Sequence, residues 1–88
     1  MRVEFRASFA KDLRSVRDKG LLKQIKETIE LVEQAQRLEE IANLKKLRGK
    51  GNYFRIRIGD RRIGIAVEND TVTFVRCLNR KEIYRYFP

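Results

Sequence analysis

Residues 53–68 read YFRIRIGDRRIGIAVE, and the alternation of side chains in this stretch decides the fold of the 88-residue chain. Side chains alternate between the two faces of a β-strand, and Gly-Asp is a favourable two-residue turn. A turn at Gly59-Asp60 places Ile56 opposite Ile63, so that the aliphatic side chains of both strands share one face of a hairpin. The opposite face then carries three arginines, which are Arg55, Arg57 and Arg62.

A third strand extends the hairpin into an antiparallel meander. Residues 71–78 alternate in the same way, and Asn69-Asp70 is a second two-residue turn. This register places Arg76 opposite Ile63, on the aliphatic face of the sheet. Either the Arg76 side chain reaches past the edge of the sheet or the register is wrong by one residue.

The first half of the chain predicts one strand followed by helices. Residues 2–7 alternate as a half-buried strand, and Ser8 can cap a helix that ends at Gly20. A short helical turn is expected over residues 38–42. Before it, a longer helix carries an apolar stripe formed by Leu22, Ile25, Ile29 and Val32. The sequence therefore predicts a single α+β domain over residues 1–88: a strand, two helices, a three-stranded meander and a short C-terminal tail, with an antiparallel sheet and the helices on one face.

Residue composition excludes several classes of protein. A single cysteine, Cys77, cannot form an internal disulfide, and the absence of histidine excludes a Ser-His-Asp or Cys-His nucleophile. Zinc would find almost no ligands, so we expect no metal and no cofactor. No apolar run is long enough for a membrane span or a signal peptide, and we therefore expect a cytoplasmic protein without a membrane partner.

The positive charge is concentrated in the second half of the chain. Residues 44–88 contain twelve basic and four acidic residues, whereas residues 1–43 contain nine basic and eight acidic ones. This excess indicates an anionic partner such as a nucleic acid or an acidic protein. Arginine suits phosphate in particular, because its planar guanidinium makes paired hydrogen bonds. Gly64 and Ala66 are expected to leave the arginine face shallow, with space for a polyanion; the alternative is an ordinary solvent-exposed strand face.

Further basic residues lie on either side of the meander in the sequence. Residues 45–52 form a basic loop punctuated by glycine, and residues 78–88 form a basic and aromatic tail. A tyrosine beside cations can stack on a nucleobase, whereas Ile83, Tyr86 and Phe87 are suited to dock the tail on the core. The basic residues that we expect to contact RNA are Lys45, Lys46, Arg48, Lys50, Arg61, Lys81 and Arg85.

The order and spacing of these motifs resemble a known family. The residues that carry the resemblance are Leu47-Arg48-Gly49, the stretch from Tyr53 to Ile65, and Asn79-Arg80-Lys81-Glu82-Ile83-Tyr84. With the chain length and the order of elements, they resemble the RelE/ParE superfamily of bacterial toxins over nearly the whole chain. Basic residues fill the nuclease positions, so the chain is more similar to the RelE branch than to the gyrase-poisoning ParE branch.

The resemblance implies a type II toxin–antitoxin toxin that cleaves mRNA on the ribosome. The implied reaction is attack of a 2′-hydroxyl on the adjacent phosphodiester, which leaves a 2′,3′-cyclic phosphate and a 5′-hydroxyl end. The implied partners are an acidic cognate antitoxin and the ribosome with mRNA in its A site. The matched catalytic positions are Arg55, Arg57, Arg62, Arg80 (or its neighbour Lys81) and Tyr84, whose ring would stack on an mRNA base. Arginine is a poor proton acceptor, so proton removal falls to the ribosome, water or Tyr84.

Two other functions are compatible with the same sequence. A ParE-like toxin would share the fold and inhibit a topoisomerase. A non-catalytic RNA-binding module would use the arginine face only to hold phosphates. Cleavage of mRNA on ribosomes separates the first function from both alternatives, and gyrase inhibition separates the alternatives from each other.

Overall fold

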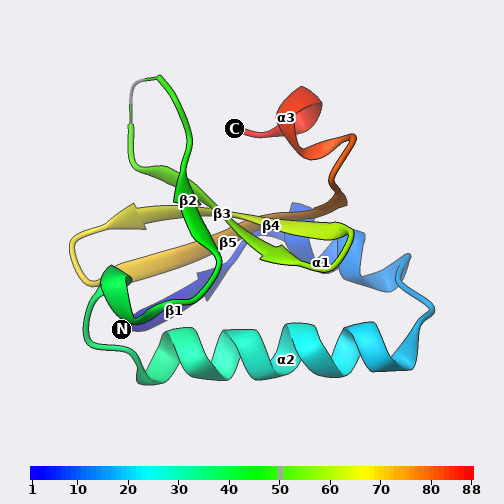
Figure 1. Cartoon of the computed structure of the whole chain (residues 1–88), viewed down its shortest axis with the longest axis horizontal. Coiled ribbons are helices and arrows are strands. Elements are labelled where there is room, and N and C mark those ends of the chain that lie inside the picture. Colours follow the sequence, from blue (N-terminus) through cyan, green and yellow to red (C-terminus); the bar gives the residue numbers. More distant parts are fainter. Residues whose placement is uncertain (50) are drawn as a thin grey trace.

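A computed structural model describes residues 1–49 and 51–88, and the RNA contact predicted for Lys50 lies outside these described residues. Within them, a five-stranded sheet has the strand order β1-β5-β4-β3-β2 (Figure 1). The strands are β1 (Arg2–Phe5), β2 (Leu44–Lys46), β3 (Tyr53–Ile58), β4 (Arg61–Glu68) and β5 (Thr71–Asn79). The meander β3-β4-β5 forms as predicted, and β2 is a short edge strand that overlaps the predicted basic loop.

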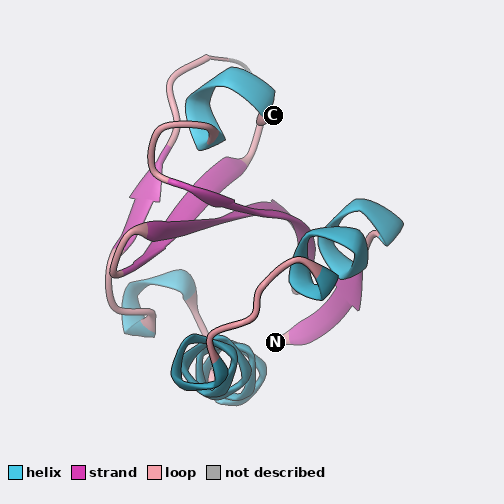
Figure 2. Ribbon diagram, turned by 90° about the vertical axis from the view of Figure 1, so that its right-hand side faces the viewer, coloured by secondary structure: helices cyan, strands magenta, loops and turns pink. Residues whose placement is uncertain are grey.

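Helices cover both faces of the sheet. They are α1 (Ala7–Arg14), α2 (Lys19–Gln34), the 3₁₀ turn η1 (Leu38–Glu40) and α3 (Ile83–Tyr86). α2 runs along one face, and the short C-terminal helix α3 lies on the opposite side of the sheet (Figure 1, Figure 2). The predicted α+β class is confirmed, and the tail adds a helical turn on the face opposite α2.

β1 joins the sheet in the parallel direction, which the antiparallel prediction did not include. Val3 pairs with Val72 and Phe5 with Phe74 along the outer edge of β5. Two helices separate β1 from the meander, and a connection of this length allows either strand direction. In the described chain the sheet is therefore mixed, with one parallel pair and three antiparallel pairs.

The β3–β4 register is the predicted one. Ile56 pairs with Ile63, and Arg57 pairs with Arg62, across the turn at Gly59-Asp60. Ile56 and Ile63 are buried, whereas Arg57 is exposed on the other face. The hairpin thus separates aliphatic from cationic side chains, as the alternation predicts.

The first two helices are bounded by residues other than those predicted. Ser8 lies inside α1 and does not cap it; its hydroxyl donates to the backbone carbonyl of Val75 at 2.6 Å. Gly20 lies in the first turn of α2 and does not end a helix. The reason is that Asp18 caps α2, its carboxylate accepting hydrogen bonds from the backbone N–H groups of Gly20 and Leu21.

The main core lies between the sheet and the first two helices. Phe9 of α1 and Ile25 of α2 are buried there against the sheet. In the tail, Ile83 and Phe87 are buried, whereas Tyr86 is 50% exposed. Docking of the tail is therefore confirmed for Ile83 and Phe87 and wrong for Tyr86. No helix in the described residues combines the length and the apolar character needed to cross a membrane.

A β-bulge in β5 settles the position of Arg76. Ile65 pairs with Phe74 but Gly64 pairs with Arg76, so Val75 is an extra residue in β5. A bulge inserts one residue into one strand and shifts the pairing beyond it. The predicted register therefore holds up to Phe74 and is wrong by one residue at Arg76.

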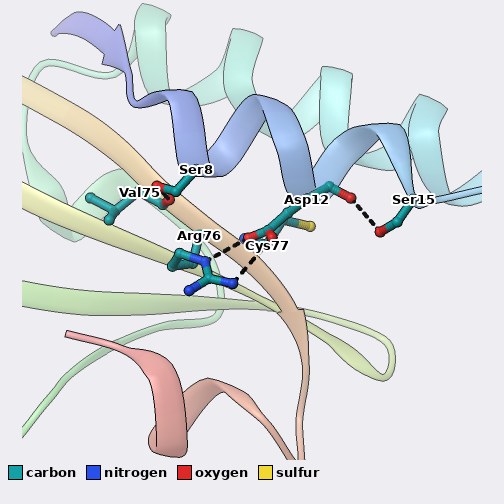
Figure 3. Close-up of polar contacts among 6 residues, drawn as sticks. All are labelled: Ser8, Asp12, Ser15, Val75, Arg76 and Cys77. Atoms are coloured by element: carbon teal, nitrogen blue, oxygen red, sulfur yellow. Dashed lines mark hydrogen bonds and ion pairs between the residues drawn. The ribbon is translucent and has the colours of Figure 1, made fainter.

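Asp12 of α1 satisfies the polar groups that follow the bulge at the edge of β5 (Figure 3). Its carboxylate accepts a hydrogen bond from the backbone N–H of Cys77 at 2.8 Å. The same carboxylate accepts from Arg76, with distances of 2.8 Å to Nε and 3.2 Å to Nη2. This hydrogen-bonded pair raises the pKa of Arg76 above its usual value. Together with the Ser8–Val75 hydrogen bond, it fixes α1 to β5.

We expect Asp12→Ala to lower the free energy of unfolding by about 2–3 kcal/mol, because the Cys77 N–H and the Arg76 guanidinium lose their acceptor. Asp12→Asn keeps one oxygen for the Cys77 N–H but loses the charge, so the loss should be roughly half as large. Urea denaturation of both variants measures the difference. An Asp12→Ala protein as stable as the parent would contradict the role of Asp12 in fixing α1.

Candidate functional site

Four arginines and one tyrosine gather on the face of the β3–β4 hairpin that points away from the main core. Arg62 lies within electrostatic reach of the other four side chains. Arg55 Nε also donates a hydrogen bond to the Tyr84 hydroxyl oxygen at 3.3 Å. The structure thus brings together all five residues predicted as catalytic: Arg55, Arg57, Arg62, Arg80 and Tyr84.

The electrostatic character of this arginine cluster is clearest at Arg62. Partial burial, followed by the positive charges of Arg55 and Arg57, lowers the pKa of Arg62 below its usual value. Arg80 acts in the same direction, and Tyr84 acts against it. Arginine nevertheless stays protonated at neutral pH. A positive charge that its neighbours disfavour is stabilised when an anion approaches, so the cluster is suited to bind phosphate.

Neutral oxygens orient two of these arginines. Arg55 donates from Nη1 to the backbone carbonyl of Asn43 at 3.3 Å. Arg62 donates from Nη1 to the backbone carbonyls of Gly59 at 2.7 Å and Arg61 at 3.0 Å. Sequence analysis missed the Asn43 and Gly59 carbonyls. The sequence does carry one indication of these two carbonyls, because Asn and Gly are the residues that most readily adopt a left-handed backbone.

The arginine cluster keeps its positive charge. Among the described residues, the ion pair within 4.0 Å joins Arg76 to Asp12 and involves no member of the cluster. Backbone carbonyls and a tyrosine hydroxyl carry no net charge, so they hold the guanidinium groups in place without neutralising them.

The turn after β5 places Arg80 and Tyr84 beside the hairpin. The backbone N–H of Arg80 donates to the Asp60 carbonyl at 2.8 Å, which ties this turn to the β3–β4 turn. The Asn79 side-chain oxygen accepts two backbone N–H groups, and its amide donates to Glu82 Oε1 at 2.8 Å. α3 begins directly after these bonds. Tyr84 on α3 is 59% exposed, so its ring is free to stack on a ligand.

Phe87 fills the space that the sequence analysis left open beside the arginines. A Cβ at Gly64 would lie 2.7 Å from carbons of the Phe87 ring. Tyr53 packs edge-on against the same ring, with 5.7 Å between centroids, and Phe87 is buried. The prediction that Gly64 leaves this face shallow for an anion is therefore wrong. Because Gly64 has no side chain, the Phe87 ring can pack directly on the backbone at this position, and the tail docks there.

Three of the predicted RNA contacts lie on the sheet, and they are divided between its faces. Lys45 lies opposite Arg55 and therefore joins the cationic face. Lys46 is the next residue of the strand and points to the other face. Arg61 lies opposite Ile58, which also places it on the core side, away from the cluster.

The other predicted RNA contacts within the described residues are Arg48, Lys81 and Arg85, and all three are exposed outside the strands. Arg48 follows the edge strand β2 (Leu44–Lys46) in the sequence. The Arg85 guanidinium lies 5.6 Å from the centroid of the Tyr86 ring.

A groove of about 1000 Å³ opens beside the arginine cluster. Its lining includes Arg57, Arg62 and Arg80 of the cluster together with Thr28 and Leu31 of α2. Leu31 is 65% exposed. The groove thus offers cationic, polar and apolar contacts to a bound chain, and its lining also contains the acidic residues Glu27, Glu40 and Asp60.

The fold and the cluster define a small α+β protein with a histidine-free cationic site, and comparisons with known proteins assign its family. The sequence profile described as "ParE toxin of type II toxin-antitoxin system, parDE" matches residues 3–84. Toxin RelE3 of Methanocaldococcus jannaschii is 45% identical over 89 residues, which span 100% of both chains. The chain therefore belongs to the RelE/ParE superfamily of type II toxins, and it is a member of the RelE branch.

Solved structures have the same fold. The RelB-RelE antitoxin–toxin complex from Methanococcus jannaschii matches with a TM-score of 0.82 and 44% identity, over 97% of this chain and 99% of that chain. An archaeal RelE-RelB complex from Pyrococcus horikoshii OT3 has a TM-score of 0.73 at 24% identity, over 90% and 93% of the two chains. The YoeB dimer from Staphylococcus aureus has a TM-score of 0.73 at 20% identity, over 91% and 97%. The similarity noted for bacterial toxins thus extends to an archaeal one.

We expect Gly64→Ala to displace Phe87 and to destabilise the protein by about 1–3 kcal/mol, because the new Cβ has no space beneath the ring. Hydrogen–deuterium exchange should become faster in α3, which carries Tyr84. In a Phe87→Ala background the same change should be much less destabilising, since the ring is absent. Equal destabilisation in both backgrounds would contradict this packing.

Proposed function

We propose that this chain is a ribosome-dependent mRNA endonuclease that inhibits translation. The observation that carries the proposal is the cluster of four arginines beside Tyr84, two of which, Arg55 and Arg62, are oriented by neutral oxygens. RNA offers phosphodiester anions, which stabilise such a cluster of positive charges, together with bases that can stack on an exposed tyrosine. Membership of the RelE branch supports the same conclusion.

The proposed reaction uses no metal ion and no cofactor. The 2′-hydroxyl oxygen attacks the adjacent phosphorus, and the bond from phosphorus to the 5′-oxygen breaks. The 2′-hydroxyl loses its proton and the departing 5′-oxygen gains one, so the products are a 2′,3′-cyclic phosphate and a 5′-hydroxyl. Negative charge grows on the phosphate oxygens in the transition state, and fixed cations stabilise it.

Each member of the cluster has a proposed part in this reaction. Arg57 and Arg62 are cross-strand neighbours, so both can donate to one phosphate. Arg80 lies beside them in the groove. The Tyr84 hydroxyl accepts from Arg55 and keeps its own proton free to donate. Since arginine does not accept protons at neutral pH, the ribosome, water or Tyr84 removes the 2′-hydroxyl proton.

The surrounding basic residues are proposed to bind the RNA backbone. Lys45 extends the cationic face, and the groove gives a nucleotide chain room beside Arg57 and Arg62. A toxin that acts on translating ribosomes works in the cytoplasm. The further phosphate contacts that we propose are the exposed residues Arg48, Lys81 and Arg85. Lys46 and Arg61 point to the other face of the sheet, and Lys50 lies outside the described residues, so they are not among the proposed contacts.

We expect Arg62→Ala to lower the rate of ribosome-dependent mRNA cleavage about 100–1000-fold, because the transition state loses a charged donor. Single-turnover cleavage of mRNA in the ribosomal A site measures this rate. Thermal melts should show little change in stability, since the substitution relieves like-charge repulsion. Arg14→Ala, an exposed substitution on α1 with the same change in charge, should cleave at the parental rate.

The same assay tests the function as a whole. An Arg62→Ala protein that cuts at the parental rate would contradict the site. A parental protein that leaves A-site mRNA intact but inhibits DNA gyrase would favour the ParE-like alternative. A protein that binds RNA without either activity would favour a non-catalytic module.

We further propose that a cognate antitoxin inhibits this toxin by covering its cationic surface with an acidic segment. The matched structures from Methanococcus jannaschii and Pyrococcus horikoshii are complexes of RelE with RelB. In this chain, residues 44–88 hold eight more basic than acidic groups, twelve against four. Such a surface favours an acidic partner through charge complementarity.

We expect the association rate of toxin and antitoxin to fall as salt concentration rises, because salt screens long-range attraction. Stopped-flow mixing of the purified proteins at several salt concentrations measures this rate. Arg57→Ala should reduce the salt dependence, whereas Arg14→Ala on α1 should affect it less. Failure of the toxin to co-purify with the product of the adjacent gene at physiological salt would contradict the proposed partner.

A further inference from the structure

Two residues beside the arginine cluster have a left-handed backbone. Asn43 has φ of 62° and Gly59 has φ of 57°. The Asn43 carbonyl accepts from the backbone N–H of Arg57 at 3.1 Å and from Arg55 Nη1 at 3.3 Å. The Gly59 carbonyl accepts from Arg62 Nη1 at 2.7 Å. Each left-handed residue therefore aims its carbonyl at one of the arginines.

The residue type at these two positions controls the direction of the carbonyl. Glycine adopts the left-handed region freely and asparagine does so more readily than most residues, whereas a β-branched residue is strongly disfavoured there. A β-branched side chain at position 43 or 59 would drive the backbone out of this region and turn the carbonyl away. At Gly59 a Cβ meets nothing within 4 Å, so such a change acts through the backbone and not through a clash.

A carbonyl has an advantage over a carboxylate in this position. It accepts a hydrogen bond and fixes the guanidinium, but it leaves the positive charge available for phosphate. From Asn43 the contacts continue through Arg55 to the Tyr84 hydroxyl. The orientation of Tyr84 thus depends on the Asn43 backbone as well as on α3.

We propose that Asn43 and Gly59 are positioning residues, whose left-handed carbonyls hold Arg55 and Arg62 in the geometry needed for RNA cleavage. This inference rests on the proposed nuclease function. It assigns no contact with RNA to either residue; both act through the arginines that they orient.

The test compares substitutions that keep the left-handed backbone with substitutions that oppose it. Asn43→Val and Gly59→Val oppose it, whereas Asn43→Gly and Gly59→Asn permit it. Asn69 is a matched control, because it has φ of 55° in the β4–β5 turn, away from the cluster. Asn69→Val therefore imposes the same backbone strain without changing an arginine contact.

We expect Asn43→Val and Gly59→Val to lower the single-turnover cleavage rate about 10–100-fold, because small displacements of catalytic groups have effects of this size. Affinity for ribosomes carrying mRNA with a 2′-deoxy scissile nucleotide should stay within about threefold of the parent, since the charges remain. Asn43→Gly and Gly59→Asn should cleave nearly as fast as the parent. Asn69→Val should melt at a temperature as low as Asn43→Val does and still cleave at the parental rate. Equal loss of cleavage in Asn69→Val and Asn43→Val would overturn the proposal.

Nuclear magnetic resonance of the arginine side chains separates this inference from the nuclease function. In Asn43→Val the Arg55 guanidinium should rotate faster, and its Nε proton should exchange faster, than in Asn43→Gly. Unchanged Arg55 signals in both variants would overturn the positioning role even in an active enzyme. If the parent fails to cleave mRNA, the proposed function is wrong, and this comparison still decides whether Asn43 holds Arg55.

Discussion

The register of the β3–β4 hairpin is the constraint on which the rest of the structure depends. Ile56 and Ile63 are buried opposite each other, and burial of each side chain contributes roughly 1.5–3 kcal/mol. The same register places Arg57 opposite Arg62, a like-charge pair that destabilises the sheet by roughly 0.2–1 kcal/mol. Burial therefore outweighs repulsion. A slip of one residue would expose the isoleucines and bury the arginines, so the core itself keeps the cations together.

Local pattern was enough to predict this hairpin, because a strand has a period of two and the Gly59-Asp60 turn leaves one register. The sheet face on which Arg55, Arg57 and Arg62 lie followed directly from the register of the hairpin. Predictions failed where contacts between distant segments decide the outcome. The bulge at Val75 accompanies the hydrogen bonds that α1 makes with the edge of β5, and Phe87 occupies the surface above Gly64. Neither contact has a signal in the neighbouring sequence, and the parallel pairing of β1 has none either.

Arg76 and Arg62 illustrate two uses of the same side chain in one small fold. Arg76 donates to the Asp12 carboxylate, and this hydrogen bond raises its pKa. Arg62 is partly buried near other cations, and these surroundings lower its pKa. Its hydrogen bonds go to backbone carbonyls. The charge of Arg76 is already paired with Asp12 within the protein itself, and this pair stabilises the junction of α1 with β5. Arg62 forms no ion pair within 4.0 Å among the described residues, which is typical of a site that receives its anion from a ligand.

Charge and geometry therefore have separate consequences for a cationic site of this kind. Any polyanion gains from uncompensated arginines, whether it is RNA or an acidic protein segment, and such attraction weakens with salt. Charge alone thus does not distinguish a substrate from an inhibitor. Cleavage additionally requires the guanidinium groups to meet the phosphate as it changes shape, which depends on their orientation. In this chain uncharged groups orient Arg55 and Arg62, namely the carbonyls beside the hairpin and the hydroxyl of Tyr84. Under the proposed nuclease function, affinity depends mainly on the guanidinium charges, whereas cleavage also depends on the uncharged oxygens that orient Arg55 and Arg62. A substitution that disturbs these oxygens is therefore expected to change cleavage more than binding.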